Sequence, residues 1–215
     1  MQIFKDTLPQ RNLTKKEAKD IFEDVITSRN LSAFPFKNDA ESTFRKHCLL
    51  VADIAETIAE KSGMDSLKAY VFGLLHDSGR YKDERAENTF HSVEGFYYLM
   101  KLNLPECARI SITHSFYQKD FNPETYVYSE NLLQQCRQYL KEIEYNDYDK
   151  LIQLSDILND MGRMCTIEYR FLSISKRYDV PLNKFTVSMQ ELRKIKAYFD
   201  NKCGCDIYSL LNIED

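Results

Sequence analysis

The chain has 215 residues, of which 43% are hydrophobic, and a formal net charge of −4 at pH 7. This length predicts one domain, with two small ones as the alternative, and the nearly balanced charge argues against an extended nucleic-acid surface but not against a small phosphate pocket. No apolar run approaches the roughly 20 residues of a membrane span, and the N-terminal stretch MQIFKDTLPQRNLTKKE is too polar for a signal peptide, so we expect a cytoplasmic protein without membrane contact.

The first half of the chain is predicted to be helical, because few glycines and prolines interrupt it and capping residues mark the helix ends. Helices are predicted from a capping box at Thr14 and Glu17 to about residue 28, from about Ala40 to Ser62 with Gly63 as its stop, and from the cap Asp65 to His76 and Asp77. The polar segment from Arg80 to Asn88 is predicted to be a loop.

The second half continues the helical pattern. Helices are predicted to begin at the caps Thr89 and Ser129 and at Pro105, to include DKLIQLSDILNDM, and to cover about residues 165–178 and 185–201, with a loop from Phe116 to Tyr128. No segment shows a convincing strand pattern, so the sequence predicts an all-α fold. We expect one domain over residues 1–215, with a core at about residues 40–165 and helical additions at both ends.

The six cysteines form no CxxC pair. In a reducing cytosol they are predicted to be free and mostly buried thiols, with a redox role for Cys203 and Cys205 as the alternative.

The four histidines of the chain share one context, because each lies in or beside a predicted helix whose other residues are apolar. They are His47, His76, His91 and His114. Asp77 adjoins His76, and Asp156 interrupts an apolar helix face in LIQLSDIL. A charged aspartate is costly to bury unless something pairs with it, and a metal ion would do so.

Each of these residues also has a simpler interpretation. A lone histidine on an apolar face is usually a satisfied core residue, Asp77 could accept a hydrogen bond at a helix end, and Asp156 could pair with Arg163 or another base. The order of the whole set, which is H, HD, H, H and D and uses every histidine, favours a metal site.

Three segments resemble the HD-domain superfamily of metal-dependent phosphohydrolases. FRKHCLLVADIAETIAEKSG resembles its first-histidine helix, AYVFGLLHDSGR its LLHDIGK motif with Ser78 and Arg80 in place of Ile and Lys, and LIQLSDILN its closing helix. The resemblance covers about residues 40–165 and implies an HD-type helical bundle with additional N- and C-terminal helices.

The resemblance implies a ligand for every residue of the ordered set. His47, His76, Asp77 and Asp156 would bind a first metal, and His91 and His114 resemble the ligands of the binuclear subgroup, in which Asp77 bridges both ions. We therefore expect two divalent transition-metal ions, such as iron or manganese, with Asp77 as the catalytic residue that orients the attacking hydroxide.

A phosphate substrate also needs cations. Arg80 and Arg163 are the substrate-binding candidates, with surface or structural roles as the alternative, and Lys82, Arg85 and Lys119 are weaker ones. Asp160 could support the ligands, although a solvated acid is the favoured interpretation. The aromatic loop with Phe116, Tyr117 and Phe121 is where we would first look for a substrate wall.

The resulting hypothesis is a phosphohydrolase that acts on a nucleotide or another small phosphoester, which could be a dinucleoside polyphosphate. SDILNDMGR resembles the ADKIEPxR motif of the hydrolases that cleave those compounds, with the arginine one residue later. The alternatives are a mixed-valence di-iron oxygenase of the same superfamily and a non-catalytic, ligand-binding regulatory module. The amphipathic C-terminal segment VSMQELRKIKAYF could form a homodimer, although packing on its own core is favoured.

Overall fold

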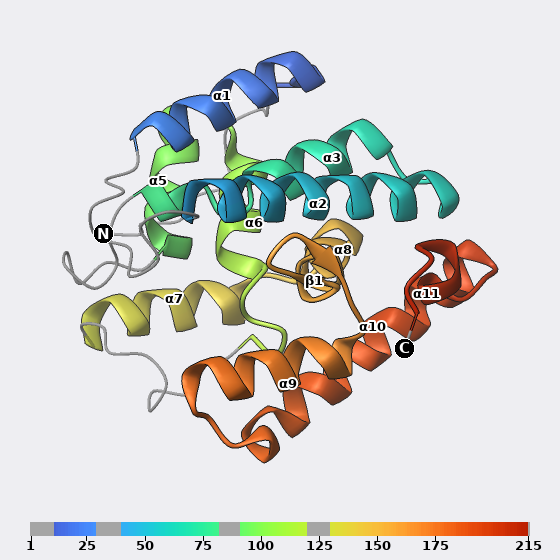
Figure 1. Ribbon diagram of the computed structural model, residues 1–215. Helices are drawn as coiled ribbons and strands as arrows, with labels where there is room; N and C mark the ends of the chain where they lie inside the picture. The colour runs from blue at the N-terminus through green and yellow to red at the C-terminus, as the bar shows by residue number, and fades with distance from the viewer. Residues whose placement is uncertain (1–10, 29–39, 82–90, 120–129, 215) are drawn as a thin grey trace.

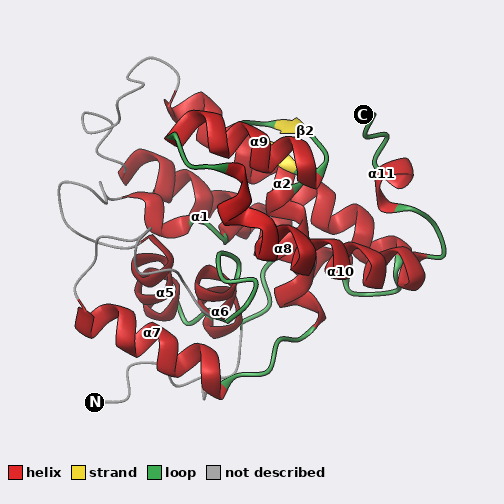
Figure 2. Ribbon diagram, turned by 90° about the horizontal axis from the view of Figure 1, so that it is seen from below, coloured by secondary structure: helices red, strands yellow, loops and turns green. Residues whose placement is uncertain are grey.

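The computed structural model describes residues 11–28, 40–81, 91–119 and 130–214, and it confirms the all-α prediction. Figures 1 and 2 show helices through this part of the chain, with one small β-hairpin beside α9. The α-helices are α1 (Lys15–Ser28), α2 (Ala40–Lys61), α3 (Ser66–Leu75), α5 (His91–Lys101), α6 (Pro105–Thr113), α7 (Glu130–Glu142), α8 (Asp147–Ile157), α9 (Ile167–Tyr178), α10 (Thr186–Cys203) and α11 (Ile207–Leu210), and the 3-10 helices are η2 (Ser78–Tyr81) and η3 (Leu182–Phe185). Within these ranges, no helix combines the length and the apolar character that crossing a bilayer requires.

Helix α3 lies at the centre of the molecule. Every residue from Ala69 to Leu75 is buried, which is the expected place for a helix that is apolar on all sides. Figure 1 shows α2 running alongside it and α1 above the pair. The predicted cap at Asp65 is confirmed, because its Oδ1 accepts a hydrogen bond from the backbone N–H of Lys68 at 3.0 Å. The predicted end of this helix is confirmed as well, because α3 ends at Leu75 and the next two residues, His76 and Asp77, are buried.

The predicted helix through Met161 is wrong beyond Ile157. After α8 the chain forms an antiparallel hairpin of β1 (Asn159–Asp160) and β2 (Arg163–Met164), although the sequence showed no convincing strand. Met161 and Gly162 have φ angles of 54° and 87°, and positive φ at both central residues is what a type I′ turn requires. The hairpin rests on α2, where a side chain at position 162 would come within 2.7 Å of Lys46 Cβ.

The predicted loop from Arg80 to Asn88 is wrong at its beginning. The N–H of Arg80 donates to the carbonyl of Asp77 at 3.0 Å, so the first two residues belong to η2. The predicted caps Thr89 and Ser129 lie outside the described residues, as do Lys82, Arg85 and Phe121.

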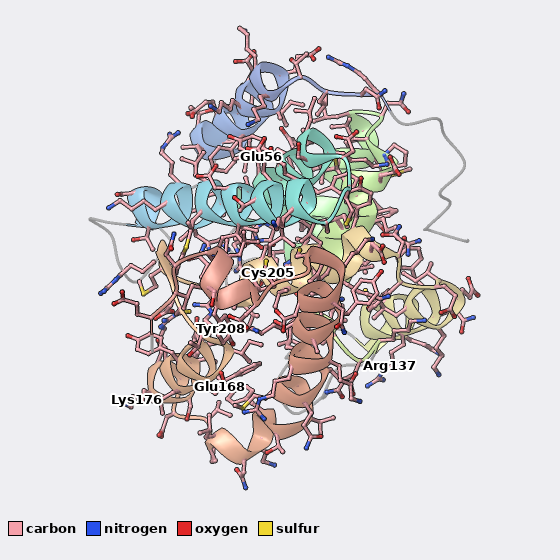
Figure 3. The ribbon with its side chains drawn as sticks, turned by 90° about the vertical axis from the view of Figure 1, so that its right-hand side faces the viewer. Glu56, Arg137, Glu168, Lys176, Cys205 and Tyr208 are labelled. Atoms are coloured by element: carbon pink, nitrogen blue, oxygen red, sulfur yellow. The ribbon has the colours of Figure 1, made fainter. Side chains whose placement is uncertain are left out.

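The C-terminal helices form a layer below α8 in Figure 1. Leu192, Phe199 and Cys203 of α10 are buried, which confirms that this amphipathic helix packs on the core of its own chain. Tyr208 of α11 accepts a hydrogen bond from the N–H of Ile167 at 3.1 Å and so ties the end of the chain to the start of α9, near Glu168 (Figure 3). The single domain, the homodimer and the cytoplasmic location stay predictions.

Candidate metal centre

The structure brings together all six predicted ligands, which come from five elements of the fold. His76 and Asp77 follow the end of α3, His114 follows the end of α6, His91 begins α5, and His47 and Asp156 lie within α2 and α8. His76, Asp77, His91 and His114 are buried. The side chains of His47 and Asp156 are 13% and 18% exposed, so solvent reaches the cluster from their side.

Backbone carbonyls orient two of the imidazoles. His76 Nδ1 lies 2.7 Å from the carbonyl oxygen of Gly73, and His114 Nδ1 lies 3.1 Å from that of Ile110. Because a carbonyl only accepts, each Nδ1 carries the hydrogen and each Nε2 is left as a lone-pair donor. The Nε2 of His114 accepts the hydroxyl of Ser115 at 2.9 Å. In metal sites, a ligating histidine typically donates its other ring N–H to a carbonyl, as Nδ1 does here in His76 and His114.

Asp77 presents a different carboxylate oxygen to each of two histidine pairs. Its Oδ2 lies 3.8 Å from His47 Nε2 and 3.7 Å from His76 Nε2. Its Oδ1 lies 3.4 Å from His91 Nε2 and 3.5 Å from His114 Nε2. This Oδ1 is buried and accepts no hydrogen bond from the described part of the chain. A carboxylate placed in this way has one oxygen for each of two cations.

Asp156 completes the pair on the α2 side. Its Oδ1 lies 3.2 Å from His47 Nε2 and 3.9 Å from His76 Nε2, and the two Nε2 atoms are 3.3 Å apart. The predicted alternative was that Asp156 pairs with Arg163 or another base. The pair with Arg163 is wrong, because that side chain lies exposed on β2, and the base that Asp156 meets is His47.

Burial and charge act in opposite directions on the two aspartates. Burial alone would raise the pKa of Asp77, but the charges of Arg80 and of the neighbouring imidazoles hold it well below its ordinary value. Burial alone would also raise the pKa of Asp156. The contacts with His47 and His76 outweigh burial, so the pKa of Asp156 is lowered. Burial also lowers the pKa of His76 to about 4, despite the charge of Asp77. The cluster therefore combines ionised carboxylates with a neutral imidazole at position 76, which are the states that bind metals.

The close packing of η2 against α5 positions His91. Gly79 lies so near α5 that a Cβ there would stand 1.8 Å from the carbonyl oxygen of His91 and 2.4 Å from the N of Gly95. Only glycine permits this approach, which brings His91 to Asp77.

Two amide side chains donate hydrogen bonds to backbone carbonyls at or next to the candidate ligands His47 and His114. Asn159 Nδ2 donates to the carbonyl of His47 at 2.9 Å, and Gln153 Nε2 donates to the carbonyl of Thr113, next to His114, at 2.8 Å. Both amides are fully buried, and both come from the α8 region that carries Asp156.

The donor set fits divalent transition metals. Two groups can each hold an ion, with ligand atoms within 4.8 Å of one another: His47, His76 and Asp156, and His76, Asp77 and His114. Neutral imidazoles and carboxylates suit iron, manganese, cobalt, nickel and zinc.

Comparison with known families agrees with this geometry. A model of the HD domain matches residues 44–161, which is more than half of the chain. The chain belongs to the HD domain family. The matched range agrees with the core predicted at about residues 40–165, and HD domains bind divalent metals. No curated protein and no solved structure matches the chain.

The two predicted phosphate-binding arginines of this HD domain lie in different surroundings. Arg80 is at the centre, where its Nε donates to Asp77 Oδ2 at 2.6 Å and its Nη2 lies 3.4 Å from His91 Nε2. Arg163 makes no ion pair within the described residues, and its role in substrate binding stays a prediction.

The expectation that Asp160 is a solvated acid is wrong. Its side chain is only 12% exposed, and its carboxylate accepts hydrogen bonds from Arg170, Arg177 and Ser173. Sequence reasoning missed Arg170, whose charge also helps to lower the pKa of Asp156. The only available signal was a basic residue on the next helix, which is not specific.

The remaining predicted residues have structural surroundings. Lys119 donates to the carbonyl of Ile143, and Phe116 is buried in the core, so Phe116 cannot form a substrate wall. All six cysteines are free and only Cys205 is not buried, which confirms the thiol prediction. Burial raises the pKa of Cys203, which does not favour a redox role.

Proposed function

We propose that this HD-domain protein is a metal-dependent phosphohydrolase that cleaves a nucleotide or another small phosphoester. The observation that carries the proposal is the Asp77 carboxylate, which faces two pairs of histidines with its two oxygens and contacts a guanidinium. A dinucleoside polyphosphate is one member of the proposed substrate class.

The residues of the centre would have distinct roles. His47, His76 and Asp156 would hold one ion, His91 and His114 would hold a second, and Asp77 would contact both. When bound, two divalent ions activate water and neutralise the negative charge of a phosphoryl group.

The chain itself supplies the charge that recognises phosphate. The Arg80 side chain is 35% exposed, and its guanidinium carries a positive charge next to Asp77, to which its Nε donates. Arginine suits a tetrahedral phosphate because it donates two parallel hydrogen bonds. Arg80 would thus hold the phosphoryl group beside Asp77, at the end of the cluster that His91 occupies.

The test is hydrolysis together with metal content. The protein is loaded with Mn²⁺, or with Fe²⁺ under anaerobic conditions. It is assayed for p-nitrophenol release from bis-p-nitrophenyl phosphate, for phosphate release from nucleoside monophosphates, and for the mononucleotide products of diadenosine tetraphosphate. Asp77→Asn is expected to lose metal and turnover together. Asp24→Asn, on the exposed side of α1, is the matched control and should keep both.

Three results would contradict the proposal. Full turnover by Asp77→Asn would show that the centre is not catalytic. Oxygen uptake by the iron-loaded protein, without phosphoester cleavage, would favour the di-iron oxygenase. Bound metal with neither activity would favour a regulatory module.

A further inference from the structure

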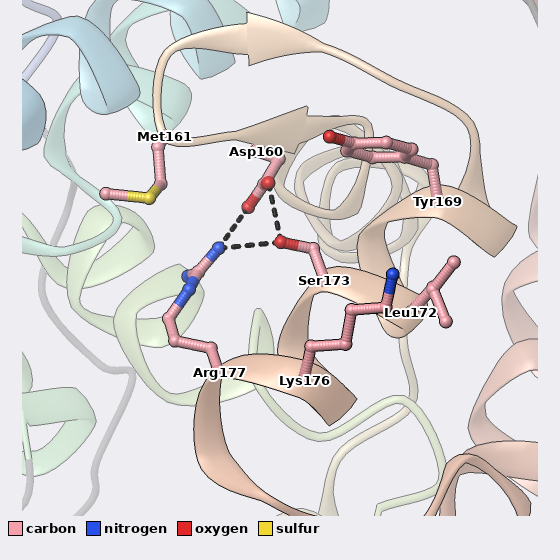
Figure 4. A pocket seen from close by; sticks show the side chains of 7 residues that line it. All are labelled: Asp160, Met161, Tyr169, Leu172, Ser173, Lys176 and Arg177. Atoms are coloured by element: carbon pink, nitrogen blue, oxygen red, sulfur yellow. Dashed lines mark hydrogen bonds and ion pairs between the residues drawn. The ribbon is translucent and has the colours of Figure 1, made fainter.

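A pocket of about 370 Å³ lies between the β1–β2 hairpin and helix α9 (Figure 4). The hairpin turn contributes Asp160 and Met161, and α9 contributes one face from Tyr169 to Arg177. The volume lies within the range of about 300 to 1,000 Å³ that small-molecule sites occupy. The six ligands of the metal centre do not line it.

The polar wall of the pocket is rigid. Asp160 Oδ1 accepts hydrogen bonds from Arg170 Nη1 and Arg177 Nη2, both at 2.6 Å, and Asp160 Oδ2 accepts from Ser173 at 2.7 Å. Arg177 Nη2 also donates to Ser173 Oγ at 2.9 Å, and Figure 4 shows the resulting triangle. The arginines are therefore held in place before any ligand arrives.

The charge around this wall is positive. The lining contains two cations, Arg177 and Lys176, and one carboxylate, Asp160, which also pairs with Arg170 outside the lining. Lys176 is exposed and forms no ion pair within the described part of the chain. The surplus of positive charge favours an anionic ligand.

The rest of the lining is apolar and aromatic. Tyr169, Met161 and Leu172 are 55%, 49% and 40% exposed, which is unusual for large apolar side chains on one small surface. Tyr169 presents its ring beside the pocket (Figure 4). A ring of this kind can stack on a flat heterocycle, and the cations can contact a phosphate.

We propose that this pocket binds a nucleoside phosphate, with its phosphate at Lys176 and Arg177 and its base against Tyr169. The ligand is either the part of the substrate remote from the cleaved bond or a separate effector, and both have the same chemistry. The choice of a phosphate-bearing ligand rests on the proposed function, but binding in the pocket requires neither metal nor turnover.

The hairpin connects the pocket to the metal centre. Asp160 lines the pocket, and the adjacent Asn159 donates to the carbonyl of the ligand His47. Arg170 binds Asp160 and also acts on the charge of Asp156. A ligand in the pocket thus contacts the same short segment that supports the metal ligands.

Calorimetric titration with AMP, in EDTA so that no metal contributes, tests the proposal. Lys176→Ala and Tyr169→Ala are each expected to weaken AMP binding roughly tenfold, because each removes one ionic or stacking contact. The matched controls are Tyr178→Ala, which is exposed on α9 but outside the pocket, and Lys141→Ala on α7. Both should bind AMP with the affinity of the unchanged protein.

Two results would overturn the proposal: no AMP binding at millimolar concentration, or equal affinity in all four variants. Either could occur while the protein still hydrolyses phosphoesters, so failure of the pocket and failure of the proposed function are distinguishable.

If Lys176→Ala raises KM for diadenosine tetraphosphate but not for bis-p-nitrophenyl phosphate, the ligand is part of the substrate. If AMP changes the rate on bis-p-nitrophenyl phosphate in the unchanged protein only, the ligand is an effector.

Discussion

Asn159 donates a hydrogen bond from its side-chain Nδ2 to the backbone carbonyl of His47 at 2.9 Å, across 112 positions of the chain. Its Oδ1 meanwhile accepts the N–H of Gly162 at 2.8 Å, which closes the β1–β2 turn. One fully buried amide therefore ties the helix of one proposed ligand to the hairpin that follows the helix of another, Asp156. This contact adds a hydrogen bond to the direct packing of α2 on α8 beside the candidate metal centre.

The first prediction separates these two contacts. Asn159→Asp keeps the acceptor for Gly162 but replaces the donor to His47 with a carboxylate that repels a carbonyl. We expect it to reduce metal affinity and to cost about 3 to 5 kcal/mol of stability, because it leaves a fully buried carboxylate without a cation. Metal content and urea denaturation check this. Asn201→Asp, on the exposed side of α10, is the control, and unchanged metal affinity in Asn159→Asp would contradict the argument.

The second prediction concerns Gly79. A methyl group there would stand 1.8 Å from the carbonyl oxygen of His91, so α5 must move away from Asp77 in Gly79→Ala. We expect overpacking to cost about 1 to 3 kcal/mol. The metal content should fall from the two ions per chain that we propose toward one, because His47, His76 and Asp156 remain in place. Elemental analysis measures the outcome.

Gly204→Ala is the matched control for that substitution. Gly204 differs from Gly79 in that it has a positive φ, at 67°, and a Cβ there meets no atom within 4 Å. It should lose some stability through backbone strain and keep its metal. Equal metal content in both variants would show that the approach of η2 to α5 does not position His91.

Local signals account for the parts of the fold that the sequence predicted well. Asp65 before an apolar run and Pro105 at a first helical turn are sufficient to place α3 and α6. The hairpin was missed because NDM continues the apolar and acidic spacing of α8, and its turn residues, Met161 and Gly162, are not a common hairpin pair. Its packing on Lys46 depends on tertiary contact, which the local sequence does not encode.

The candidate centre divides in the same way. The six candidate ligands could be brought together in prediction because rare residue types occur in a characteristic order along apolar helices. Arg170 and the supporting amides of Asn159 and Gln153 could not, because their importance depends on which backbone or carboxylate they meet. Such residues are common on helices, and only the fold distinguishes them from surface residues.

The third prediction uses the buried ion pair between α6 and α8. Arg109 Nη2 lies 2.7 Å from Asp149 Oδ2, the Asp149 side chain has no exposed surface, and Thr113 donates to Asp149 Oδ1 at 2.8 Å. Arg109→Met leaves that carboxylate buried without its cation, so we expect a loss of about 3 to 5 kcal/mol in urea denaturation.

The double variant Arg109→Met with Asp149→Asn should recover part of that stability, because no buried charge remains. Lys16→Met, which breaks the solvent-exposed pair with Asp20, is the control and should have far less effect. A loss in Arg109→Met no larger than in Lys16→Met would show that the pair does not stabilise the contact between α6 and α8.

The last prediction is a pH dependence at Asp160. Burial would raise its pKa, but the hydrogen bonds from Ser173, Arg177 and Arg170 prevail and lower it below the ordinary value of about 3.9. As the pH falls, the unfolded chain therefore takes up this proton before the folded protein does. The stability that ionised Asp160 contributes is complete above the unfolded pKa and is lost as the pH falls through the folded pKa.

Asp160→Asn, which cannot titrate, should therefore be less stable than the unchanged protein at pH 7, and the difference should shrink below about pH 5. Urea denaturation of both proteins from pH 7 to about pH 2, in EDTA so that metal loss does not contribute, measures this difference. Asp24→Asn, at an exposed position on α1, is the control variant. A difference between Asp160→Asn and the unchanged protein that stays constant over this pH range would mean that the network around Asp160 does not favour its ionised form.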